Sequence, residues 1–80
     1  MRVNKKYLLR QKRALNKLIG YYDYDRATLA NALDVDITVV YTWFRRGRIS
    51  ATKAIEAEKI TKGYVTKKEL RPDVSLWSDE

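Results

Sequence analysis

Three arginines near the middle of the chain, Arg45, Arg46 and Arg48, follow a stretch rich in hydroxyl-bearing and aliphatic side chains. Guanidinium groups bind phosphate oxygens, often through two hydrogen bonds at once, and hydroxyl and methyl groups can contact the edges of DNA bases. At helical spacing, one face of this stretch carries Ile37, Thr38, Tyr41, Thr42 and Arg45. These residue types and their spacing indicate contact with nucleic acid. The alternative is that they merely line an exposed helix surface.

Two short helices joined by a tight turn, over residues 26–46, are expected to position these side chains. Asp25 is predicted to cap the first helix, with Leu29, Ala30 and Leu33 facing inward. Asp34 falls in the turn, where aspartate tolerates the left-handed conformation better than most residues do. Such a helix-turn-helix can lay its second helix in the major groove while the first braces it against the backbone.

The second of these helices is predicted to begin after an Asp36 cap and to end at Gly47. Val40 and Trp43 are three residues apart and are expected to point into the core, and Val35 to fill the apolar position of the turn. Arg26, at the start of the brace helix, is a further candidate for a phosphate contact.

Additional helices are expected on both sides of this unit. The first, over residues 6–22, has an inward face at helical spacing, although Gly20 is expected to end or kink it; that face is Leu8, Leu15, Leu18, Ile19 and Tyr22. Ser50 is predicted to cap a helix over residues 51–61, in which Glu58 needs an arginine or backbone amides as a partner. Thr66 and Glu69 have the spacing of a capping box for a last helical turn, which Pro72 closes. The sequence therefore predicts an all-α bundle of four to five short helices.

The composition restricts the possible functions. The 80 residues carry a formal charge of +7, and the pI is about 9.8, which favours a polyanionic partner such as nucleic acid. The chain has no cysteine and no histidine, so we expect no disulfide, no metal site, no cofactor and no enzymatic activity. Without a long apolar run we expect no membrane association and a cytoplasmic location.

A basic stripe is expected on the first helix, opposite its apolar face. It comprises Lys6, Arg10, Arg13 and Lys17. The stripe is either a solvated helix surface or an additional set of phosphate contacts. We accordingly divide the chain into a basic extension continuous with the first helix (1–13), a helix-turn-helix domain (14–73) and a tail (74–80).

Two blocks of the sequence resemble the Cro-like, YdaS-type regulators of phages and prophages: LANALDVDITVVYTWFRRGRIS, and AIEAEKITKGYVTKKELRPDV further on. The resemblance covers roughly residues 14–74. It departs from the family pattern at Asp34, where glycine is usual, at Asp36, where serine is frequent, and in its longer basic extension. It implies a lambda-repressor-like fold whose C-terminal segment is either a helix or a short strand, and the capping box favours the helix.

The resemblance also implies site residues and partners. Ile37, Thr38 and Thr42 would contact bases, with Tyr41 close by. The partner would be double-stranded DNA in a bacterial host cell, bound at a pseudo-palindromic operator by a homodimeric repressor. From the residues themselves, Phe44 is a candidate for a dimer contact or a contact with the sugar-phosphate backbone, and Leu76 and Trp77 belong either to a disordered tail or to a dimer contact.

Two other functions remain open at this point. The first is an antitoxin-like or antirepressor-like interaction module that uses the tail, with DNA binding secondary. The second is non-specific nucleic-acid binding through the basic stripe.

Overall fold

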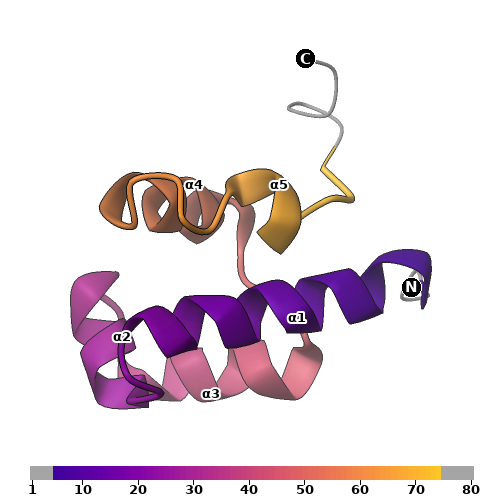
Figure 1. The fold of residues 1–80 in the computed structure, drawn as a ribbon. Helices are drawn as coiled ribbons and strands as arrows, with labels where there is room; N and C mark the ends of the chain where they lie inside the picture. Colours follow the sequence, from indigo (N-terminus) through magenta and orange to yellow (C-terminus); the bar gives the residue numbers. More distant parts are fainter. Residues whose placement is uncertain (1–4, 75–80) are drawn as a thin grey trace.

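Five helices follow one another along the part of the chain that the computed structural model describes, residues 5–74, with side chains from Leu8 onwards. They are α1 (Lys5–Tyr21), α2 (Arg26–Ala32), α3 (Ile37–Arg46), α4 (Ala51–Ile60) and α5 (Lys67–Leu70) (Figure 1). No strand occurs within these residues, so the all-α prediction is confirmed. The C-terminal segment forms the helical turn that its capping box predicts, rather than a strand.

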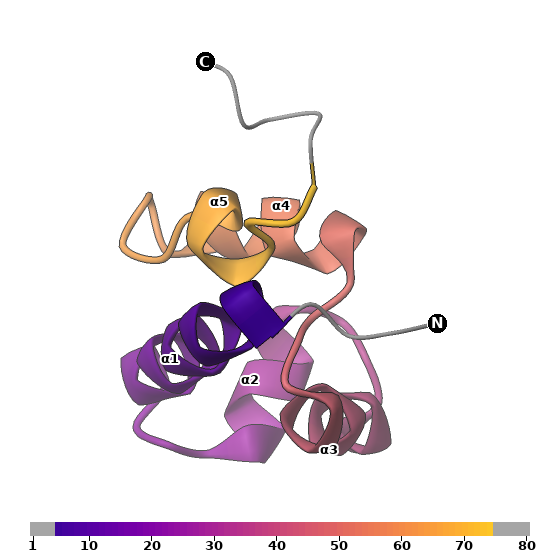
Figure 2. The ribbon, with the colours of Figure 1, turned by 90° about the vertical axis from the view of Figure 1, so that its right-hand side faces the viewer.

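The long helix α1 lies between two pairs of shorter helices. In both views, α2 and α3 lie on one side of α1, and α4 and α5 lie on the other (Figures 1 and 2). The closest packing joins α2 to α3, α1 to α5 and α4 to α5. The helix-turn-helix pair therefore occupies one end of the molecule, and the C-terminal helices occupy the opposite end.

The core collects apolar side chains from all five helices and from the loops between them. Its fully buried large members are Leu15, Leu18, Leu29, Leu33, Val40, Ile49, Val65 and Leu70. Burying a side chain of this size stabilises a fold by about 1.5–3 kcal/mol. Trp43 is also buried, with 5% of its surface exposed, which confirms its predicted place in the core.

Helix starts agree closely with the sequence predictions, because each is fixed by a local cap. The side chains of Asp25, Asp36 and Ser50 accept hydrogen bonds from backbone N–H groups in the first turns of α2, α3 and α4. The full capping box forms between Thr66 and Glu69. Glu58 accepts a 2.8 Å hydrogen bond from the backbone N–H of Lys67, so its partner is a backbone amide.

Gly20 neither ends nor breaks α1, which continues to Tyr21. Its role is instead steric. A Cβ atom at Gly20 would lie 3.0 Å from the hydroxyl oxygen of Tyr24, so the absence of a side chain leaves room for that ring beside the helix. The chain then turns through Asp23 and Tyr24, both at positive φ, before α2 begins.

A polar lock joins the end of the described chain to α1 and to the α3–α4 loop. Asp73 accepts hydrogen bonds from Nε and Nη2 of Arg71, at 2.9 and 3.0 Å. Nη1 of Arg71 donates to the carbonyl of Ile49 at 3.1 Å, and the amide of buried Gln11 donates to Asp73 at 3.2 Å. The hydrogen bonds from Arg71 lower the pKa of the Asp73 carboxyl below its ordinary value. This lock holds α5 and the segment after it against α1.

Candidate nucleic-acid interface

The turn between α2 and α3 sets the direction of α3. Asp34 adopts φ 57°, the left-handed conformation predicted for it. The backbone N–H of Val35 then donates to the carbonyl of Ala30 at 3.0 Å, and the half-buried Val35 packs against the core. Buried Ala30 has a small side chain, which suits the close packing of α2 on α3. The two helices thus form the predicted helix-turn-helix.

The outer face of α3 carries most of the side chains predicted to lie there. Thr38, Tyr41, Arg45 and Arg46 are exposed, and Thr42 is half-buried. Ile37 differs from the prediction, because it is half-buried and packs against the core. Its spacing explains this: Ile37 precedes buried Val40 by three residues and therefore shares the inward face of the helix.

Both threonine hydroxyls on this face already donate hydrogen bonds within the protein. Oγ1 of Thr38 donates to Oδ1 of Asp36, and Oγ1 of Thr42 donates to the carbonyl of Thr38, each at 3.0 Å. Hydrogen bonds from the backbone N–H and then the hydroxyl of Thr38 lower the pKa of Asp36, whose carboxylate is ionised at neutral pH and can only accept hydrogen bonds. Each hydroxyl consequently presents oxygen lone pairs, rather than a proton, to an incoming molecule.

Arg26 and two aromatic rings connect the start of α2 to α3. The guanidinium carbon of Arg26 lies 5.7 Å from the ring centre of Tyr41 and 5.4 Å from that of Phe44. Cation–π contacts of this kind orient an arginine while leaving N–H donors at its edges available. Phe44 is half-buried and packs against the core, so only part of its ring is open to solvent.

The arginines at the end of α3 have different surroundings. Within the described residues, Arg45 and Arg46 make no ion pair or hydrogen bond and extend into solvent. Arg48 lies 3.7 Å from Oδ2 of Asp73, with 48% of its side chain exposed, so part of its charge is neutralised by the polar lock. The strongest unpaired positive charge at this end is therefore that of Arg45 and Arg46.

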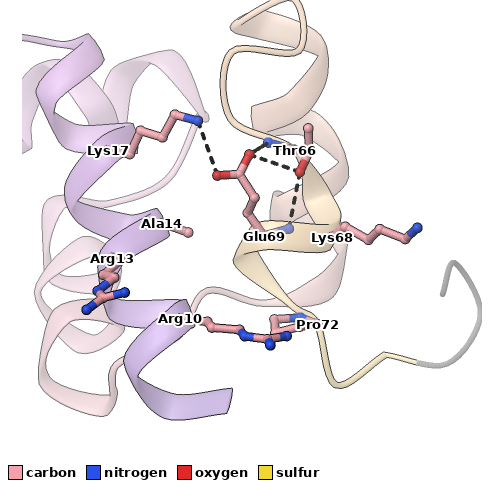
Figure 3. Close-up of a pocket in the computed structure, with 8 residues that line it drawn as sticks. All are labelled: Arg10, Arg13, Ala14, Lys17, Thr66, Lys68, Glu69 and Pro72. Atoms are coloured by element: carbon pink, nitrogen blue, oxygen red, sulfur yellow. Dashed lines mark hydrogen bonds and ion pairs between the residues drawn. The ribbon is translucent and has the colours of Figure 1, made fainter. Parts of the chain in front are cut away.

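The basic stripe does not extend this surface. Arg10, Arg13 and Lys17 line a groove between α1 and α5 (Figure 3), and α5 lies on the side of α1 away from α3 (Figure 2). Lys17 is paired with Glu69 at 3.2 Å. The side chain of Lys6, and the candidate dimer contacts Leu76 and Trp77, lie outside the described residues.

One cation beside α3 was missed by the sequence reasoning. A Cβ atom on Gly47 would lie 3.2 Å from Cε of Lys12, which places the exposed Lys12 side chain at the end of α3. Helical spacing could have predicted this position, because Lys12 projects from a different side of α1 than the stripe residues Arg10, Arg13 and Lys17 do. Exposed Val39 on α3 was also not considered. Together, the polar outer face of α3 and the cations that surround it form one surface.

The described part of the chain contains no candidate metal site and no candidate membrane span. No three His, Cys, Asp or Glu side chains converge there as metal ligands would. None of the helices in that part combines the length and the apolar character that crossing a bilayer requires.

Comparison with known proteins identifies a family. A family model described as bacterial toxin YdaS matches residues 25–78, more than half of the chain. The match begins at the cap of α2 and confirms the YdaS-type resemblance of the two sequence blocks. No curated protein and no solved structure matches significantly.

Proposed function

We propose that this chain, which belongs to the YdaS family, is a sequence-specific DNA-binding transcriptional regulator of the Cro-like repressor type. The observation that carries the proposal is the outer face of α3, where exposed Thr38 and Tyr41 are followed by the unpaired cations Arg45 and Arg46. In a helix-turn-helix, this face is the one that enters the major groove.

Positive charge on both sides of α3 supports docking against a duplex. Arg26 lies over the α3 aromatic rings, and Lys12 and Arg48 lie near the end of the same helix. Contacts from such side chains to phosphates fix the orientation of the protein but do not read the sequence. They release condensed counterions, so the affinity should fall steeply as salt is raised.

Base reading is assigned to Thr38 and Thr42, with a contribution from Tyr41. Because both threonine hydroxyls donate within the protein, their oxygens would accept from base donors. In the major groove those donors are the N4 amino group of cytosine and the N6 amino group of adenine. Half-buried Ile37 would reach a thymine methyl only with its exposed part.

Homodimer formation on an inverted repeat belongs to the same proposal. One recognition helix reads only a few base pairs, whereas two helices about one DNA turn apart give useful selectivity. Phe44 would contribute to the dimer only through its exposed edge, because the rest of the ring packs against the core.

The description of the family as a bacterial toxin favours a member of a toxin–antitoxin pair. The second candidate is therefore the interaction module, antitoxin-like or antirepressor-like, that the sequence leaves open. In that case a protein partner would be the main target and DNA binding secondary. Deleting residues 74–80 separates the candidates. Loss of a protein partner with full retention of DNA affinity would favour the second.

The face that contacts DNA can be tested by removing two charges at a time. We expect Arg45→Gln with Arg46→Gln to weaken binding to duplex DNA at least tenfold, measured by fluorescence anisotropy. The matched control is Lys59→Gln with Lys62→Gln, which removes the same charge from exposed positions in the last turn of α4 and in the turn that follows it. Equal losses in the two variants would contradict the proposed interface.

A further inference from the structure

The groove between α1 and α5 is a second surface with a charge of its own. It encloses about 630 Å³. Four cationic side chains line it: Arg10, Arg13 and Lys17 from α1, and Lys68 from α5 (Figure 3). The single carboxylate in its lining is Glu69. The groove therefore has more positive than negative groups.

Most of that positive charge has no partner within the protein. Glu69 pairs with Lys17 and also accepts from the backbone N–H and the hydroxyl of Thr66, so its oxygens are occupied. In the described part of the chain, Arg10, Arg13 and Lys68 make no ion pair and no hydrogen bond. Three uncompensated cations thus line the groove, with the Arg13 and Lys68 head groups turned outwards at its two rims (Figure 3).

Apolar and aromatic groups accompany these cations. Ala14 and Pro72 contribute to the lining between the charged side chains. At the Lys17 end, the ammonium group lies 5.0 Å from the ring centre of Tyr64, which packs on Tyr21 with ring centres 5.4 Å apart. Both tyrosines are large exposed hydrophobic residues. Tyrosine and arginine are the residue types that contribute most at protein–protein contacts.

We propose that this groove docks an acidic segment of a partner protein that also carries apolar side chains. Carboxylates of the segment would pair with Arg10, Arg13 and Lys68, and an apolar side chain would lie against Ala14, Pro72 or Tyr64. A nucleic-acid backbone fits less well, because it has no apolar side chain to lie against Ala14, Pro72 or Tyr64.

The position of the groove allows a partner and DNA to bind together. α5 and α3 lie on opposite sides of α1 in both ribbon views (Figures 1 and 2). A segment lying along α5 would therefore leave the outer face of α3 open. This proposal does not depend on the DNA-binding function, since the two surfaces share no residue.

A displayed library of random twelve-residue peptides tests the groove with the full chain. We expect enrichment of peptides that combine Asp or Glu with Leu, Phe or Trp. Arg10→Gln with Arg13→Gln should weaken the selected peptides at least tenfold. The control Lys59→Gln with Lys62→Gln should bind them within about twofold of the unmodified chain. DNA affinity of the groove variant should equal that of the control.

Three results would overturn the proposal. The first is no enrichment, or enriched peptides that bind the groove variant normally. The second is a larger loss of DNA affinity in the groove variant than in the control, which would identify the groove as a nucleic-acid contact. The third is an occupant from the protein itself. Tighter peptide binding after deletion of residues 75–80 would identify the chain's own acidic tail as that occupant. A dimer that the groove substitutions dissociate would identify a second copy of the chain.

Discussion

The hydroxyl of Thr38 donates a 3.0 Å hydrogen bond to Asp36, the residue whose carboxylate also caps α3. One side chain therefore starts the helix and orients the hydroxyl on its outer face. The carboxylate of Asp36 is ionised at neutral pH and only accepts hydrogen bonds, so the hydroxyl proton stays directed towards it. The oxygen of Thr38 is left as an acceptor at the position where a base edge would lie.

Thr38→Val should reduce discrimination at one base pair of each half-site. Valine keeps the shape of threonine but has no acceptor, so a cytosine or adenine amino group loses its partner. We expect a loss of about 1 kcal/mol, or about fivefold, at that position and little change elsewhere. Titration of a panel of single-base operator variants measures this. Thr38→Ser, which keeps the acceptor, is the control, and a uniform loss over the whole panel would show that Thr38 does not read a base.

Arg46→Ala should weaken all DNA sequences alike. Arg46 is exposed and has no partner in the described part of the chain, so its expected role is a phosphate contact. The slope of log affinity against log salt is negative, and removing one such contact should make it less steep by about one. Lys59→Ala removes the same charge from α4 and should leave the slope nearly unchanged. A preference that changes between sequences would instead place Arg46 on a base.

Gly47→Ala should destabilise the protein more than Gly63→Ala does. Both glycines have positive φ, 84° and 85°, so alanine is strained at either position by about 1–2 kcal/mol. A Cβ atom at Gly47 would also lie 2.9 Å from Cδ1 of Leu8, whereas nothing lies within 4 Å of one at Gly63. We expect the difference in unfolding free energy, from urea denaturation, to be about 1 kcal/mol. Equal effects would mean that Leu8 moves aside freely.

Asp73→Asn should lower the melting temperature at neutral pH and have progressively less effect in acid. Hydrogen bonds from Arg71 hold the pKa of Asp73 below its ordinary 3.8. The resulting stability is fully present above about pH 4, and it is lost as the pH falls through the folded-state pKa. At pH 7 we expect a cost of about 1–2 kcal/mol, equivalent to about 5–15 °C.

Calorimetry between pH 2.5 and pH 7 measures this dependence on pH. Asp23→Asn is the control, because Asp23 is exposed and asparagine is well tolerated at its positive φ. A difference between Asp73→Asn and the unmodified chain that stays constant down to pH 2.5 would show that ionisation of Asp73 does not stabilise the fold.

Features that depend on a few neighbouring residues could be predicted from the sequence. The caps at Asp25, Asp36 and Ser50, the capping box of Thr66 and the left-handed Asp34 are all local, and all are confirmed. The helical fold and the family followed from the same patterns.

Contacts between distant parts of the chain could not be predicted in this way. Gln11 and Asp73 are 62 residues apart, and Nζ of Lys53 donates to the carbonyl of Leu33 across 20 residues. Helical spacing predicts which residues share a face of α1, but it does not predict which element lies against that face. The packing of α1 against α5 is therefore needed to show that the basic stripe points away from α3. The half-buried position of Ile37 could have been predicted from its spacing to Val40. The base contacts of Thr38 and Thr42 and the phosphate contacts of Arg26, Arg45, Arg46 and Arg48 remain predictions.

Selection of bound sequences from a random duplex pool, at near-physiological salt, tests the central claim most directly. We predict an enriched inverted repeat whose half-site centres lie about one DNA turn apart. The same selection with Arg45→Gln and Arg46→Gln should recover little DNA. Retained binding without any enriched sequence would contradict the claim of a dimeric, sequence-specific regulator.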